Sequence, residues 1–265
     1  METLTDRYSR PLPDWVHDIK EDVKDKVKGS IASKVCREGN IPALQQLLVT
    51  FWPFVDQFPK IVRRGCVKFI KHELLTHPGN ADDLLSLLVL ADKTLTLIER
   101  DEAEHRELWI KAAGAVGLTH QDLERPPIPL VKKLITKMEA WTDPAAMFLR
   151  FAAVEIIAEV ASGHFLESQE FRTAVGTKGL EWFLAHTKHE GESHESLTYR
   201  LAITFRERGV TQEEAGALIQ PLADLFVEAA ESAVATVASR SQRYARSNVK
   251  RGQADLARAS SDNPM

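Results

Sequence analysis

The sequence lacks the features that mark several large protein classes. It has two cysteines, Cys36 and Cys66, which follow no redox or metal-binding spacing, so we expect free thiols in a reducing cytoplasm. No apolar run approaches the roughly eighteen residues of a membrane span, and the polar start contains no secretory signal. A net charge of −4 gives no general attraction for nucleic acid. We therefore expect a soluble cytoplasmic protein that binds neither membranes nor nucleic acid.

Strand-like alternation of apolar and polar residues is also scarce, and most segments repeat their apolar residues with helical spacing. Pro53 is expected to interrupt one of these helices and Pro59 to end it. The sequence predicts an all-α fold of about eight helices in one domain, residues 1–238, followed by a polar, mobile tail at residues 239–265. Helices are expected near residues 14–37, 41–54, 60–75, 81–116, 130–141, 145–165 and 211–238.

A histidine-rich stretch near the middle of the second half carries the first candidate chemistry. His186, Glu190 and His194 are four residues apart, so on one continuous helix they would share a face. Two imidazoles and a carboxylate so placed suit a divalent metal such as iron. His189 is an alternative to His186 if the helix breaks at Gly191. The competing interpretation is an exposed, charged helix end.

A second motif, Glu-x-x-His, places Glu102 and His105 three residues apart on the helix expected at residues 81–116. Di-iron proteins use this spacing because both side chains can reach one metal pair. Glu99 could take the place of Glu102, and a solvated charged face is the competing interpretation. The motif falls within an apolar stripe, which favours burial and contains Leu95, Ile98 and Trp109.

The helix around residues 148–160 is apolar on nearly every side, yet it carries Glu155 and Glu159. A buried carboxylate is costly unless it is paired, protonated or bound to metal, so we expect Glu155, or alternatively Glu159, to be a ligand. An exposed stripe is the competing interpretation. Three histidines and three carboxylates suit two iron or manganese ions. The candidate ligands are Glu102, His105, Glu155, His186, Glu190 and His194.

In this order the motifs resemble those of the haem-oxygenase-like di-iron oxidases and oxygenases, relatives of the thiaminase-II and pyrroloquinoline-quinone-synthase fold. The first is Glu-x-x-His followed by Leu-Trp and Ala-x-Gly-Leu, and the buried Glu155 comes about fifty residues later. Trp-Phe-x-x-His-x-x-x-acid and a further histidine complete the pattern, which covers residues 40–235. The family has Asp where this chain has Glu190, and this chain has one extra residue before His194.

The resemblance implies a seven- to eight-helix bundle that binds two Fe(II) ions without haem and reacts with O₂, drawing on an external reductant. It implies oxygenation of a small amine or amino-acid-derived substrate, with N-oxygenation favoured, in natural-product biosynthesis, and a possible homodimer. Four aromatic side chains would line the substrate pocket or pack as plain core: Trp109, Phe148, Phe151 and Phe183.

Three other functions remain open from the sequence. The same site could perform oxidative C–C cleavage or decarboxylation, which product analysis would distinguish from N-oxygenation. A metal-free enzyme of the thiaminase or quinone-synthase type predicts that the six candidate ligands do not converge. A non-catalytic helical interaction module predicts that Glu155 and Glu159 are exposed. The substrate and the electron donor are not encoded in any motif that we recognise.

Overall fold

The computed structural model describes the chain except residues 1–3, 77–80, 142, 188–192, 207–208 and 262–265. The described residues form twelve helices and no strand, which confirms the all-α prediction. Eight of the helices have eleven residues or more. In chain order they are α1 Leu4–Tyr8, α2 Trp15–Gly29, α3 Ile31–Arg37, α4 Ile41–Thr76, α5 Ala81–Ala115, α6 His120–Leu123, α7 Pro129–Glu139, α8 Pro144–Leu166, α9 Gln169–Gly179, α10 Glu181–Ala185, α11 His194–Thr204 and α12 Gln212–Ser261.

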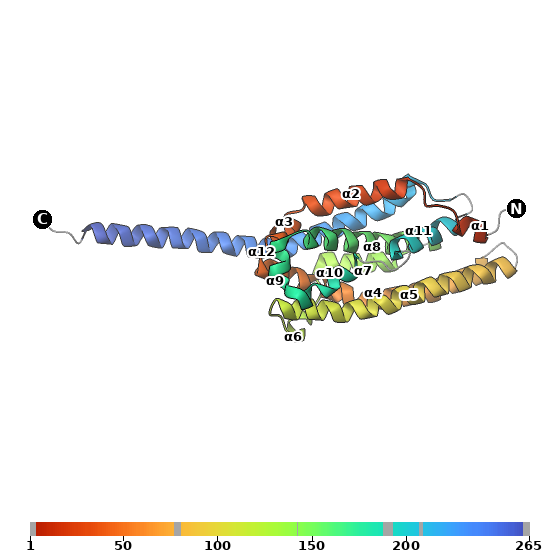
Figure 1. The fold of residues 1–265 in the computed structure, drawn as a ribbon, viewed down its shortest axis with the longest axis horizontal. Helices are drawn as coiled ribbons and strands as arrows, with labels where there is room; N and C mark the ends of the chain where they lie inside the picture. Colours follow the sequence, from red (N-terminus) through yellow and green to blue (C-terminus); the bar gives the residue numbers. More distant parts are fainter. Residues whose placement is uncertain (1–3, 77–80, 142, 188–192, 207–208, 262–265) are drawn as a thin grey trace.

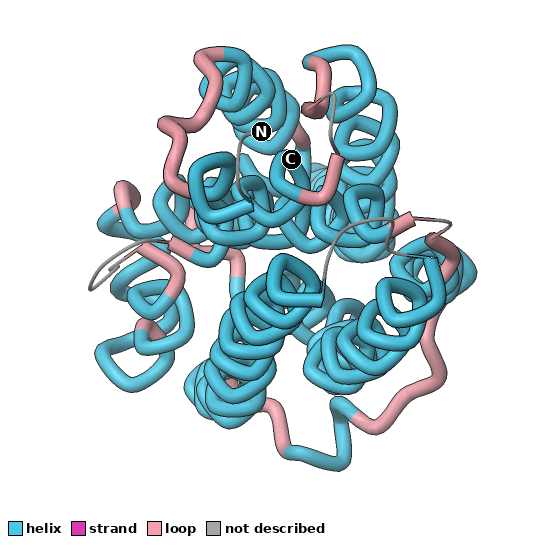
Figure 2. The backbone as a smooth tube through the Cα atoms, turned by 90° about the vertical axis from the view of Figure 1, so that its right-hand side faces the viewer, coloured by secondary structure: helices cyan, strands magenta, loops and turns pink. Residues whose placement is uncertain are grey.

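The long helices run nearly parallel or antiparallel to one another and form a bundle around α8 (Figure 1). Figure 2 looks along this bundle and shows many of the helices almost end-on. Helix α8 packs against α2, α11 and α12, while α4 and α5 form a long antiparallel pair. The central place of α8 follows from its composition, because a helix that is apolar on nearly every side must be enclosed by others.

Helix α4 corrects the expectation that prolines divide this region into two helices. It continues from Ile41 to Thr76 with Pro53 and Pro59 inside. A proline inside a helix costs about 3 kcal/mol, whereas each large apolar side chain that is fully buried contributes about 1.5–3 kcal/mol. The burial along α4 therefore outweighs the two prolines. The aromatic side chains that α4 buries are Phe51, Trp52, Phe54, Phe58 and Phe69.

The expected helix at residues 14–37 is instead two helices, α2 and α3. Ser30 separates them, because its hydroxyl oxygen accepts a hydrogen bond from the Ser33 backbone N–H and caps α3. By contrast, the expected end of the helix near Gly117 is confirmed. Gly117 has φ +85°, and the Leu118 N–H donates to the Ala113 carbonyl, the bond of a Schellman ending.

Helix α12 begins at the predicted capping box. The Thr211 N–H donates to the Glu214 carboxylate and the Glu214 N–H donates to the Thr211 hydroxyl oxygen. The helix was expected to end near residue 238 but continues to Ser261 and projects beyond the bundle (Figure 1). Alanine, arginine, lysine and glutamine make up about half of residues 239–261, and these residues favour helix. The domain boundary at residues 238/239 stays a prediction.

Both cysteines are free thiols, as expected, and Cys36 is buried. Burial raises the pKa of the Cys36 thiol to about 12, so this side chain is a small apolar component of the core and not a nucleophile. Within the part of the chain that the structure describes, no helix combines the length and the apolar character that crossing a membrane requires.

Candidate metal centre

Helix α5 turns the Glu-x-x-His motif toward the interior. Leu95, Ile98 and Trp109 of the same stripe are buried, and Glu102 is only 8% exposed. His105 Nδ1 donates a hydrogen bond to Glu102 Oε1 at 2.9 Å. The solvated-face interpretation of this motif is therefore wrong, and the helical stripe places both side chains where a metal could be held.

Helix α8 supplies Glu155, which is 8% exposed on the most enclosed helix of the bundle. Its Oε1 atom is buried and has no hydrogen-bond partner among the described residues. Burial, together with the charge of Glu102, raises the pKa of Glu155. This burial contradicts the interaction-module interpretation, which required an exposed Glu155. A buried carboxylate oxygen without a partner is the observation expected of a metal ligand in the metal-free chain.

The histidine-rich stretch does not form the single helix that was expected. His186 caps the C-terminus of α10, and α11 begins at His194. The physical reason at the second boundary is Ser193, whose hydroxyl accepts from the Ser196 N–H and so starts a new helix. His186 and His194 therefore do not share a face of one continuous helix. Two of the predicted residues, Glu190 and its neighbour His189, lie outside the described residues.

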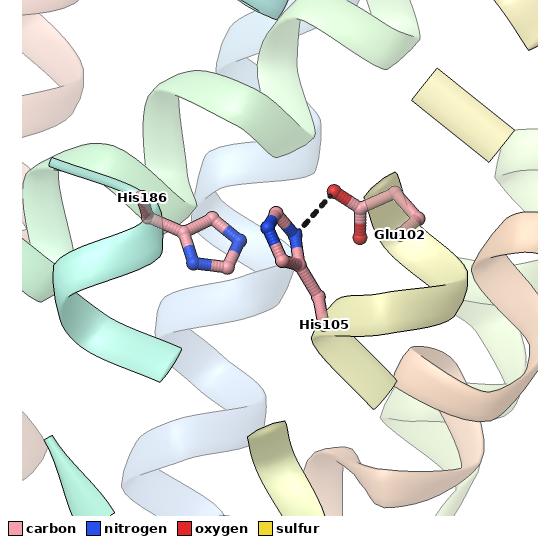
Figure 3. Close-up of side chains that lie close together, drawn as sticks. All are labelled: Glu102, His105 and His186. Atoms are coloured by element: carbon pink, nitrogen blue, oxygen red, sulfur yellow. Dashed lines mark hydrogen bonds and ion pairs between the residues drawn. The ribbon is translucent and has the colours of Figure 1, made fainter. Parts of the chain in front are cut away.

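The described candidates nevertheless converge from four helices. One group consists of Glu102, His105 and His186, and the other of Glu102, Glu155 and His194. Within each group the possible ligand atoms lie within 4.8 Å of one another. Figure 3 shows the first group, with the two imidazole rings facing each other beside the Glu102 carboxylate. Because Glu102 belongs to both groups, it is placed as a bridging carboxylate would be.

His186 is held with one nitrogen free for a ligand. Its Nδ1 donates to the backbone carbonyl of Trp182 at 2.8 Å, which leaves the Nε2 lone pair unprotonated in the neutral ring. Burial lowers the pKa of His186 to about 4, and the nearby His105 contributes. The ring is therefore neutral across the physiological range. A hydrogen bond from the second ring nitrogen to a carbonyl is how proteins commonly orient a metal-bound histidine.

His194 has a second partner that no sequence motif indicated. Its Nε2 donates to Asp101 Oδ2 at 3.2 Å, while its Nδ1 lies 3.7 Å from Glu155 Oε2. A carboxylate behind a histidine orients the ring and makes it a stronger ligand. In the sequence Asp101 is one of several charged residues around Glu102 and belongs to no motif. Its partner lies 93 residues away, so the local sequence carried no signal for this contact.

Two alternative ligands lie outside the described clusters. Glu99 pairs with Arg63 near the surface, with 3.5 Å between Glu99 Oε1 and Arg63 Nη1. Glu159 forms an ion pair with Lys20, at 2.8 Å between Oε2 and Nζ. Glu99 lies about one helical turn from Glu102, and Glu159 about one turn from Glu155, but both face different neighbours. The structure thus favours Glu102 and Glu155 among the alternatives.

A cavity of about 140 Å³ adjoins the candidate metal centre and is lined mainly by apolar side chains. Trp109 and Phe183 line it, as predicted for the pocket. Phe148 and Phe151 lie instead in the core: the Phe151 ring packs against that of Phe58, and the Phe148 ring against that of Phe69. Phe58 itself lines the cavity, but neither Phe148 nor Phe151 does, so the alternative of plain core packing holds for these two side chains.

The residues that are present fit a pair of divalent metal ions. Three imidazoles and two buried carboxylates form two groups that share one member. The unpartnered Glu155 Oε1 adds an acceptor that no group of the described chain satisfies. Mixed nitrogen and oxygen donors of this kind suit iron or manganese, and zinc hydrolases need fewer ligands. The metal-free interpretation, which predicted that the candidate ligands do not converge, is not supported by this geometry.

Metal affinity is expected to rise with pH between about 6 and 8.5. Burial opposes protonation of His194, but its interaction with Glu155, aided by Glu102 and Asp101, outweighs that effect and raises the pKa of His194 to about 9. A metal ion must displace this proton, so below pH 9 each unit of pH should increase affinity about tenfold for that one proton. Anaerobic calorimetric titration with Fe(II) at several pH values measures the slope. A flat profile would show that His194 is not a ligand.

No family model and no curated protein matches the chain. Among solved structures it is similar to a TenA homolog from Pseudomonas syringae pv. tomato, with a TM-score of 0.68 and 17% sequence identity. The match covers 88% of this chain and 97% of that chain. The similarity shows the fold, which is the all-α haem-oxygenase-like bundle that the sequence motifs implied. At this identity the similarity does not extend to substrate or cofactor.

Proposed function

We propose that the chain is a non-haem di-iron oxygenase that uses O₂ to oxidise a small organic substrate. The observation that carries the proposal is the pair of buried ligand groups that share Glu102. These groups border an apolar cavity, to which Glu102, Glu155 and His186 contribute. A haem-oxygenase-like fold is compatible with such an enzyme. Two Fe(II) ions held there would supply O₂ activation, with further electrons from an external reductant.

In this proposal each residue of the centre has a distinct task. His105 and His186 would hold one ion, Glu155 and His194 the other, and Glu102 would contact both. The Trp182 carbonyl keeps the ring of His186 in one orientation. The apolar walls of the cavity exclude water, which protects a reactive oxidant from side reactions.

More specifically, the proposed reaction is N-oxygenation of an amine substrate in a natural-product pathway. An apolar cavity disfavours the charged form of an amine, so an enclosed amine group would lose its proton. Its nitrogen lone pair would then be available for oxidation. The lining thus supports an amine substrate that is delivered neutral. Oxidative C–C cleavage by the same centre would give different products, so product analysis separates the two.

The proposal is tested by anaerobic titration with Fe(II) followed by rapid mixing with O₂. Wild type is expected to bind about two ions and to show a transient visible absorption band. His105→Ala and His194→Ala remove one member of each ligand group, and both are expected to lose the band. No iron uptake, with thiaminase-type hydrolysis that survives a chelator, would instead identify a metal-free enzyme.

A further inference from the structure

The cavity beside the metal centre is elongated along α8. Its lining residues on this helix extend from Val154 to Phe165, a distance of about 16 Å at 1.5 Å per residue. Glu155, a candidate ligand, lies at the beginning of this range. A long stripe of α4, from Leu44 to Phe58, lines the same space. The cavity therefore extends well beyond the metal centre, toward the C-terminal end of α8.

Outside the candidate metal centre, the cavity lining carries no ionisable side chain among the described residues. Among the described lining residues the only ionisable side chains are those of Glu102, Glu155 and His186, all in the candidate centre. No lysine or arginine contributes to the lining among these residues. A free carboxylate or phosphate on the body of a substrate would therefore be buried without a counter-charge, which is strongly unfavourable. The cavity fits an uncharged molecular body.

One hydroxyl in this apolar lining has no partner. Ser30 is satisfied, because it donates to the Val27 carbonyl and accepts from the Ser33 N–H. Ser33 also lines the cavity and is 3% exposed, yet its Oγ atom has no hydrogen-bond partner among the described residues. A buried hydroxyl without a partner is unfavourable, so a ligand that supplies one is stabilised.

Ser33 lies toward the end of the cavity that is remote from Glu155. It precedes Arg37 of α3 by one helical turn, and the Ser168 hydroxyl donates to the Arg37 carbonyl at 2.6 Å. Ser168 lies two residues beyond the end of α8 at Leu166, and the eleven residues from Glu155 to Leu166 span about 16 Å of helix. The unpartnered hydroxyl and the candidate ligands therefore mark two separate ends of one apolar space.

We propose that this cavity selects an elongated, uncharged and mostly apolar substrate whose far end carries a hydroxyl or carbonyl group that hydrogen-bonds Ser33 Oγ. This inference rests on the proposed function and narrows its substrate class: the reacting group lies at the ligand cluster and the polar substituent at Ser33. An amino acid that places its free carboxylate toward Ser33 does not fit. Ser33 is a specificity-determining residue in this arrangement.

The test measures binding of octan-1-ol, hexan-1-ol, 1-fluorooctane and octanoate to the full-length chain by tryptophan fluorescence, since Trp109 and Trp182 line the cavity. Titrations are run anaerobically at pH 8, with and without Fe(II). Octan-1-ol is expected to bind more tightly than octanoate, and about tenfold more tightly than hexan-1-ol for its two extra methylenes. Ser33→Ala should weaken octan-1-ol about fivefold to tenfold and change 1-fluorooctane less than twofold.

Ser162→Ala is the matched control, because Ser162 also has a buried hydroxyl without a partner but does not line the cavity. It is expected to leave the binding of all four ligands unchanged. If Ser33→Ala fails to fold, Ser33→Cys replaces the hydroxyl with a thiol, which is only a weak donor and acceptor, and should show the same selective loss. Tighter binding of octanoate, or equal weakening of octan-1-ol and 1-fluorooctane, would overturn the inference. Iron uptake is recorded on the same samples. Absence of iron binding would contradict the di-iron proposal, and this result is independent of whether Ser33 contacts the ligand.

Discussion

Replacing Glu102 with glutamine is expected to abolish binding of both metal ions, and not of one alone. Glu102 is the only residue common to the two candidate ligand groups. Glutamine has the same shape but no charge, so it cannot bridge two cations or balance their charge. By contrast, His186→Ala should affect only the group with Glu102 and His105, and His194→Ala only the group with Glu155. Each of these two variants is expected to retain about one ion.

Iron content after anaerobic loading and desalting measures the result directly. Glu99→Gln is the matched control, because Glu99 lies one turn away on α5 but pairs with Arg63 near the surface. It should bind both ions. Retention of two ions by Glu102→Gln would show that the carboxylate does not bridge. Loss of both ions in Glu99→Gln would show that the ligand on α5 has been assigned to the wrong turn.

Part of the metal centre, namely Glu102, His105 and Glu155, could be predicted from the sequence because its signals are local. Glu102 and His105 lie within an apolar stripe of α5, and helical periodicity alone turns such a stripe inward. Glu155 lies on a helix that is apolar on nearly every side, which favoured burial of one of its two glutamates but did not distinguish Glu155 from Glu159. The all-α fold of about eight helices was predictable for the same reason. These features depend on residues within one helix, where spacing determines direction.

The remaining features depend on contacts between distant segments, which spacing does not encode. Asp101 supports His194 across 93 residues. Ser33 lines the cavity only because α3, α4 and α8, which are far apart in the sequence, enclose one space. The continuity of α4 through Pro53 likewise depends on burial by other helices, which outweighs local propensity. The helix break before α11, unlike these features, has a local signal in the sequence. Ser193 is an N-capping residue, but the four-residue spacing of His186, Glu190 and His194 predicted one continuous helix across it.

A buried ion cluster beside the metal centre connects three helices. Lys20 Nζ of α2 lies 2.8 Å from Glu159 Oε2 of α8 and 2.7 Å from Glu195 Oε2 of α11. The Glu195 side chain is only 6% exposed, whereas those of Lys20 and Glu159 are about one quarter exposed. Glu155 and His194 are carried by the same two helices, α8 and α11. Lys20 therefore neutralises the carboxylates that would otherwise repel each other where these helices meet.

Lys20→Met is expected to lower the free energy of unfolding by about 2–3 kcal/mol, because it leaves a buried carboxylate without its cation. This expected loss of stability is smaller than the loss on breaking a fully buried ion pair, because water partly reaches Lys20 and Glu159. Urea denaturation of the metal-free chain at pH 7.5 measures it. Lys24→Met is the matched control, because Lys24 pairs with Glu21 on the exposed side of α2 and should change stability by less than about 0.5 kcal/mol.

The pH dependence distinguishes lost charge pairing from lost packing. Burial raises the pKa of Glu195, although Lys20 opposes this, so removing Lys20 should raise it further. A carboxyl whose pKa is higher in the folded state destabilises the fold above that pKa, and the penalty disappears as pH falls through it. The defect of Lys20→Met should therefore shrink from pH 7.5 toward pH 5. Adding Glu195→Gln should recover part of the loss at pH 7.5, whereas a defect that persists in the double variant and at pH 5 would place the effect in packing.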